Sequence, residues 1–209
     1  MIRLDHGFLR GSYPPLVTPF TEGKVDLDLF AKLVDRQVAE GSHGILVTGT
    51  TAEPSSLTVA ERCALVKVAV ETVAGRIPVV AATGSQSYAE TMELTCHAEK
   101  AGADALLVVT PYYIRPPQQG LVDYFVAVGS LTRLPLMIYH IPGRAAVSAA
   151  VMNSSVVSGA RRSRIRSSSR TCGESALATS IPALFAPAMK SFWLSRLAAS
   201  ASRSSLERA

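Results

Sequence analysis

The sequence predicts an α/β fold with parallel strands, in which about five strand–helix units can be followed. Short apolar runs rich in β-branched residues recur about every 30 residues, and amphipathic helical patterns lie between them. Strands that alternate with helices form either a doubly wound open sheet or a (β/α)8 barrel.

The strand-like runs are continuous apolar stretches, each too short for a buried helix. Such runs are typical of parallel strands that are covered on both faces. They are "SYPPLVTPF" (12–20), "GILVTG" (44–49), "IPVVAATG" (77–84), "ADALLVVTP" (103–111) and "LPLMIYHIP" (134–142).

Four helical patterns lie between these runs. The first, 27–40, has one apolar stripe. Thr58 with Glu61 predicts a capping box at the start of 58–75, and Ser87 with Glu90 predicts another at the start of 87–102. These two segments end at Gly75 and Gly102, as many helices do. A weaker fourth helix covers 118–131.

Polar side chains at the ends of the predicted strands favour the barrel. No GxGxxG follows the first strand, which argues against the nucleotide-binding open sheet. Barrel enzymes collect their chemistry at the carboxyl ends of several strands. The residues found there are Thr48, Thr50, Thr51, Thr83, Ser85, Thr110, Tyr112, Tyr113, Tyr139 and His140.

A change in composition predicts a boundary near residue 150. Residues 1–150 hold 12 Lys and Arg against 14 Asp and Glu, whereas residues 151–209 hold nine against two, with 15 serines. We therefore expect 1–150 to be the N-terminal part of a barrel, since a whole one needs about 250 residues. We expect 151–209 to be a Ser/Arg/Ala-rich tail that is disordered or irregular.

Other classes are disfavoured. No apolar run of membrane-spanning length is present, and the first ten residues lack a signal-peptide core, so a cytoplasmic location is expected. The cysteines, Cys63, Cys96 and Cys172, have no CxxC spacing, which argues against a disulfide framework and a zinc site. We expect no metal and no cofactor.

Three motifs in order, "GTTAE" (49–53), "VTPYYIRPPQQG" (109–120) and "YHIPGR" (139–144), resemble the dihydrodipicolinate synthase / N-acetylneuraminate lyase family over about residues 10–150. The resemblance implies a (β/α)8 barrel and a lyase that joins pyruvate to an aldehyde through a Schiff base on lysine. It also implies a homodimer or homotetramer.

The resemblance assigns roles residue by residue. Thr50 and Thr51 resemble the paired threonines that hold the pyruvate carboxylate and join a proton relay. Tyr139 resembles the proton-shuttling tyrosine, and Tyr113 resembles the relay tyrosine that enters a neighbouring subunit's site. Arg144 resembles the arginine that grips the second substrate, which favours a carboxylate-bearing aldehyde such as aspartate semialdehyde and a role in lysine biosynthesis. Alternatives are other pyruvate aldolases of the family, for keto-deoxy sugar acids or sialic acid.

The Schiff-base lysine is not found. The family places it in a "GIKE"-type strand a little under 30 residues beyond Tyr139, where this chain reads "RIRSSS" (164–169), and the only lysine after Lys100 is Lys190. Such a reaction needs a nucleophilic amine. We therefore expect the chain to be impaired.

Three explanations of the tail remain open. It is a frameshifted continuation of the gene, a basic arm for nucleic acid, or ordinary divergence. We favour the first. With GC-rich codons assumed, reading "AMKSFWLSRLAASAS" in another frame gives Asp-Glu followed by Val-Val-Leu-Ala-Val-Ala-Ala-Gly-Gly-Val-Gly-Val. That is an acidic turn, an apolar helix and a glycine-rich approach to a strand, like the family's last units.

Overall fold

The described residues, 10–147, form a four-stranded parallel sheet in a computed structural model. The strands are β3 (Ile45–Val47), β4 (Val79–Ala82), β5 (Ala105–Val109) and β6 (Leu136–Tyr139), and they lie side by side in chain order. No reversal of strand order interrupts these four, as one would in a doubly wound sheet. The predicted α/β class is confirmed, and the unbroken strand order agrees with the predicted barrel; the predicted tail, 151–209, lies outside the described residues.

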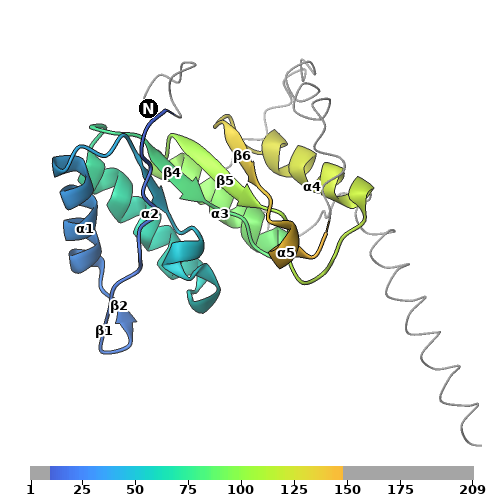
Figure 1. The fold of residues 1–209 in the computed structure, drawn as a ribbon, viewed down its shortest axis with the longest axis horizontal. Coiled ribbons are helices and arrows are strands. Elements are labelled where there is room, and N and C mark those ends of the chain that lie inside the picture. The colour runs from blue at the N-terminus through green and yellow to red at the C-terminus, as the bar shows by residue number, and fades with distance from the viewer. Residues whose placement is uncertain (1–9, 148–209) are drawn as a thin grey trace, which may run out of the picture. The chain divides into compact units, whose positions relative to one another are not determined.

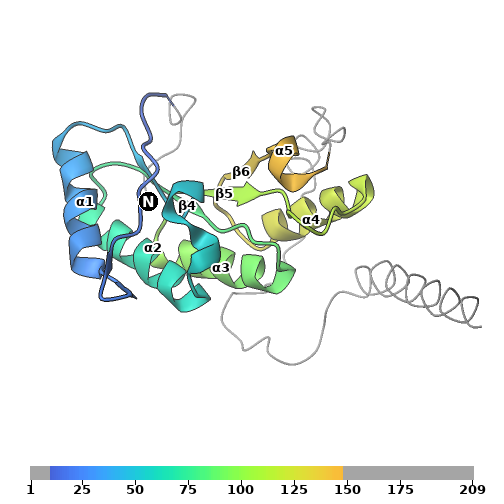
Figure 2. The same ribbon diagram turned by 60° about the horizontal axis from the view of Figure 1, so that its bottom comes forward.

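Helices cover one face of this sheet (Figures 1 and 2). They are α1 (Leu27–Ala39), α2 (Val59–Val73), α3 (Tyr88–Ala101) and α4 (Gln118–Ser130), and each packs against the next. A short helix, α5 (Pro142–Ala145), follows β6. All four predicted helices are therefore present.

Alternate residues of the strands form the covered face. Because side chains alternate along a strand, the pairing register places one residue set under the helices and the other on the opposite, inner face. The covered set is almost completely buried: Ile45, Val47, Val79, Ala81, Leu106 and Val108. Leu65, Ala69, Leu94 and Ala98 of α2 and α3 are buried as well. This layer is the core.

The inner face is less well covered. Leu46, Leu107, Val109 and Met137 on it are only half-buried. All four residues of β6 are half-buried too, and among the described strands β6 pairs with β5 alone. Parallel sheets are normally covered on both faces. Within residues 10–147, one face and one edge therefore stay partly open.

The predicted first strand, 12–20, is present only in part. Leu16 N–H donates to Leu46 C=O (3.0 Å) and Leu46 N–H donates to Pro14 C=O (3.1 Å), so this segment runs parallel to β3. Pro14 and Pro15 have no N–H groups, which reduces the pairing to an isolated bridge. Farther on, β1 (Phe20–Thr21) pairs instead with β2 (Lys24–Val25) as a small hairpin.

The first predicted capping box is confirmed. Glu61 N–H donates to Thr58 Oγ1 (3.2 Å), and Thr58 N–H donates to Glu61 Oε2 (2.8 Å). In the second predicted capping box, at the start of α3, only one of the two hydrogen bonds forms. Ser87 Oγ accepts from Glu90 N–H (3.4 Å), but the Glu90 carboxylate accepts from the Ser85 hydroxyl (2.7 Å) instead of from the cap backbone.

The capping box predicts a pH dependence of stability. Hydrogen bonds from the Thr58 backbone and then from its hydroxyl lower the pKa of Glu61 below its ordinary value of 4.5. Because the folded pKa is lower than the unfolded one, the ionised carboxylate stabilises the fold above the unfolded pKa, and this contribution is lost as pH falls through the folded pKa. We expect Glu61→Gln to lower the free energy of unfolding at neutral pH but not at pH values well below 4. Urea unfolding at both pH values measures this. An equal difference in the free energy of unfolding between variant and parent at both pH values would contradict the expectation.

Candidate active site

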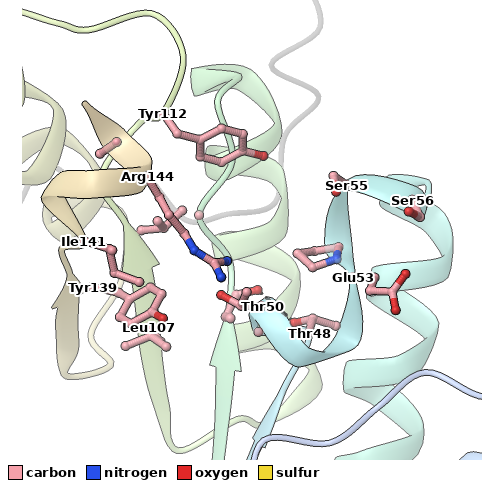
Figure 3. Close-up of a pocket in the computed structure, with 16 residues that line it drawn as sticks. Thr48, Thr50, Glu53, Ser55, Ser56, Leu107, Tyr112, Tyr139, Ile141 and Arg144 are labelled. Atoms are coloured by element: carbon pink, nitrogen blue, oxygen red, sulfur yellow. Dashed lines mark hydrogen bonds between the residues drawn. The ribbon is translucent and has the colours of Figure 1, made fainter. Parts of the chain in front are cut away.

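A cavity of about 370 Å³ opens at the carboxyl ends of the strands (Figure 3). It is the place where the sequence predicted a rim site. The residues around it are Thr48, Gly49, Thr50, Glu53, Pro54, Ser55, Ser56, Ala82, Gly84, Leu107, Val109, Tyr112, Tyr139, Ile141, Arg144 and Ala145.

One wall of the cavity is the segment that follows β3. Two 3-10 turns, Thr50–Ala52 and Pro54–Ser56, meet at Glu53, whose backbone is left-handed with φ 53°. The Thr18 hydroxyl donates to Ala52 C=O (2.9 Å) and holds the first turn. Both threonines of the first turn are exposed, but only Thr50 lines the cavity, and the adjacent Thr51 does not.

The opposite wall comes from β6 and α5. Tyr139 ends β6, and the one-turn helix α5 begins with Pro142, whose fixed φ suits that position. This turn carries Arg144. Figure 3 shows its guanidinium extending across the cavity towards Thr50, with the Tyr139 ring below it. Thr110 N–H donates to Tyr139 C=O (2.9 Å), which ties the end of β6 to the end of β5.

The two adjacent tyrosines after β5 have different positions. Tyr112 lines the cavity, whereas Tyr113 is 87% exposed, with a left-handed φ of 71°, and does not line it. The family resemblance assigns a role to Tyr113 and none to Tyr112. No pattern in the sequence separates these neighbours, because the backbone conformation of the loop decides which ring turns inward.

His140 and Thr110 form a pair that the sequence analysis did not foresee. The Thr110 hydroxyl lies 3.0 Å from His140 Nδ1, and Thr110 is almost fully buried. Neither residue is among those lining the cavity. The pair joins the segments that follow β5 and β6.

No amine faces this cavity from the described residues. Their four lysines, Lys24, Lys32, Lys67 and Lys100, are all exposed and none lines it. Residues 10–147 also contain no cluster of His, Cys, Asp and Glu that could hold a metal ion. No helix in this range is long and apolar enough to cross a membrane.

The arrangement suits a small carboxylate. Arg144 supplies a cation with several donors, the Thr50 hydroxyl can donate a hydrogen bond, and the Tyr139 phenol can donate and recover a proton. The fold and the cavity together define part of a (β/α)8 barrel with a polar rim site. Three of the five residues predicted for the site, Thr50, Tyr139 and Arg144, line one cavity, and Thr51 and Tyr113 do not.

The chain belongs to the dihydrodipicolinate synthetase family, whose model matches residues 8–157. It is 50% identical over 143 residues to 4-hydroxy-tetrahydrodipicolinate synthase of Rhizobium meliloti, covering 68% of this chain and 49% of that protein. The synthase of Thermus thermophilus is 48% identical over 142 residues, with 68% and 48% covered.

Solved structures agree with this assignment. The dihydrodipicolinate synthase of Aquifex aeolicus superimposes with a TM-score of 0.66 at 43% identity, covering 68% of this chain and 48% of that one. The enzyme of Acinetobacter baumannii complexed with pyruvate gives 0.64 at 40% identity, covering 66% and 48%. The chain thus spans about half the length of the relatives it matches.

Proposed function

We propose that this chain carries the pyruvate-binding half of a 4-hydroxy-tetrahydrodipicolinate synthase-type site and does not itself form the Schiff base. The observation that carries the proposal is the convergence of Thr50, Tyr139 and Arg144 on one cavity. The Acinetobacter baumannii relative, at 40% identity, has been crystallised as a complex with pyruvate. Pyruvate is the small keto acid that such a rim would hold.

The position of each group supports a role in this reaction. The Thr50 hydroxyl would hold the pyruvate carboxylate. The Tyr139 phenol would donate a proton to the carbonyl oxygen, and recover it, as an amine attacks the carbonyl carbon. Arg144, across the cavity from Thr50, would bind the carboxylate of a second substrate such as aspartate semialdehyde. Other pyruvate aldolases of the family would differ chiefly in that second substrate.

Two further roles rest on the resemblance alone. Thr51 would hold the pyruvate carboxylate together with Thr50 and join the proton relay, and Tyr113 would act in the cavity of a second copy in a homodimer or homotetramer. The 87% exposure of Tyr113 is compatible with insertion into a neighbour. Under this proposal, dimerisation is part of catalysis. We propose that the whole protein is a cytoplasmic biosynthetic enzyme.

The tail, 151–209, is proposed to be an out-of-frame continuation of the same gene. The match to the family model ends at residue 157, immediately before the run "SGARRSRIRSSSR". Resequencing the gene across codons 145–170 tests this directly, and an intact reading frame there would refute it. A basic arm would instead give retention on immobilised nucleic acid that falls with added salt.

Trapping with borohydride tests the loss of the Schiff base. An imine between pyruvate and a lysine is reduced to a stable secondary amine, which raises the intact mass. We expect no added mass on this chain after incubation with pyruvate and borohydride, because no lysine of residues 10–147 faces the cavity. The Rhizobium meliloti relative, treated identically, is the positive control. An adduct on any lysine of this chain, mapped by peptide digestion, would overturn the proposal.

A further inference from the structure

Arg62 is a buried cation that the roles above do not use. It lies in α2 and is 4% exposed, although arginine is rarely buried without a partner. None of the ion pairs found among the described residues involves it. A guanidinium in such a place needs other acceptors, and Nη2 finds them while the buried Nε is left without a hydrogen-bond partner.

Its acceptors belong to the wall of the cavity. Arg62 Nη2 donates to Ala82 C=O (3.1 Å) and to Gly84 C=O (3.2 Å), and both of these residues line the cavity. Ala82 C=O also accepts from the Thr48 hydroxyl (2.8 Å). Arg62 therefore reaches from the helix layer to the end of β4 and joins it to the cross-link between β3 and β4.

The chemistry of these carbonyls explains why a cation is useful there. A parallel strand that ends leaves carbonyl oxygens without ladder partners, and each carries partial negative charge. Beside a cavity for a carboxylate, such oxygens would repel the ligand. A charged donor on both oxygens offsets that repulsion and fixes their direction, because charge-assisted hydrogen bonds are stronger than neutral ones.

We infer that Arg62 is a positioning residue for the cavity. Its two hydrogen bonds, which we call the clamp, hold the Ala82 and Gly84 carbonyls at the end of β4 and offset the negative charge that would repel a carboxylate. The inference rests on the proposed function, since it takes the ligand to be pyruvate. Burial lowers the pKa of Arg62, while Tyr112, Glu90, Cys63 and Tyr124 raise it. Arginine nevertheless keeps its charge throughout the range in which proteins are handled.

The test compares two substitutions in the full chain. Arg62→Met removes the charge and keeps most of the stem, whereas Arg62→Lys keeps the charge but loses the planar fork. Arg36→Met is the matched control, because Arg36 is exposed on α1 and pairs with Glu40. We expect Arg62→Met to weaken pyruvate binding about tenfold, Arg62→Lys to weaken it about threefold, and Arg36→Met to leave it unchanged.

Pyruvate titration followed by NMR supplies two separate readouts. The dissociation constant reports the ligand, and the carbonyl ¹³C shifts of Ala82 and Gly84 report the clamp without any ligand. A merely structural role would leave the dissociation constant of the folded chain unchanged in Arg62→Met, and that result would overturn the inference. If the unsubstituted chain binds no pyruvate, the proposed function fails. The clamp then stands only if both carbonyl shifts move in Arg62→Lys and not in Arg36→Met.

Discussion

Gly84→Ala is expected to destabilise the chain by about 3 kcal/mol, the upper end of the usual cost of overpacking. Gly84 lies just beyond β4 on the cavity wall. A methyl group there would come within 2.4 Å of the Val109 backbone nitrogen and 2.8 Å of Val109 Cγ1. A backbone atom of β5 cannot turn aside as a side chain can, so β4 and β5 must separate at the cavity.

Gly129→Ala is the matched control for this substitution. Gly129 is in α4, and a methyl group added to it meets nothing within 4 Å. Alanine in a helix is better than glycine by about 1 kcal/mol, so this variant should be as stable as the parent or more so. Urea unfolding of the three chains, followed by circular dichroism, gives the comparison. A Gly84→Ala midpoint equal to that of the parent would show that the two strands are not in contact as described.

The elements of the fold could be predicted because their signals are local. Periodicity and capping residues placed all four helices to within a residue or two, as α2 shows with its cap at Thr58. The first strand could not be predicted correctly in the same way. Its apolar pattern in 12–20 is strand-like, but Pro14 and Pro15 remove the N–H groups that a ladder needs, and only the bridge to Leu46 remains.

The site could be predicted where the fold alone determines position. Residues that follow parallel strands must meet at one rim, which is why Thr50, Tyr139 and Arg144 share a cavity. Which of two adjacent residues faces the cavity depends on loop geometry, and here Tyr112 lines the cavity and Tyr113 does not. Arg62 could not be foreseen at all, because a charged residue in an amphipathic helix is normally assigned to the solvent face.

The open inner face and the free edge of β6 within residues 10–147 have a further consequence. An exposed apolar sheet edge pairs readily with other chains. We expect the chain on its own to be poorly stable or to aggregate, and sedimentation should show a broad distribution. A single cooperative thermal transition from a monodisperse species would contradict this expectation.

Supplying the other half of the barrel should restore both solubility and Schiff-base formation. When the full chain is co-expressed with the C-terminal half of the Rhizobium meliloti relative, we expect a soluble complex, because the added strands would pair with β6 and cover the inner face. The supplied half would also bring the family's Schiff-base lysine to the cavity that contains Thr50 and Tyr139. Treatment of the complex with pyruvate and borohydride should then give a nearly complete adduct on the supplied half, whereas this chain alone should give none.

Variants of this chain show whether its own cavity takes part in the complemented reaction. Tyr139→Phe removes the phenol that would move protons during imine formation, and general acid–base catalysis of this kind contributes about 10²-fold or more. Adduct formation should slow by about that factor. Tyr88→Phe, in α3 and not among the cavity residues, is the control and should leave the rate unchanged. A soluble complex in which Tyr139→Phe reacts as fast as the parent would show that the lysine acts without this cavity, because the phenol proposed to move protons there would then be dispensable.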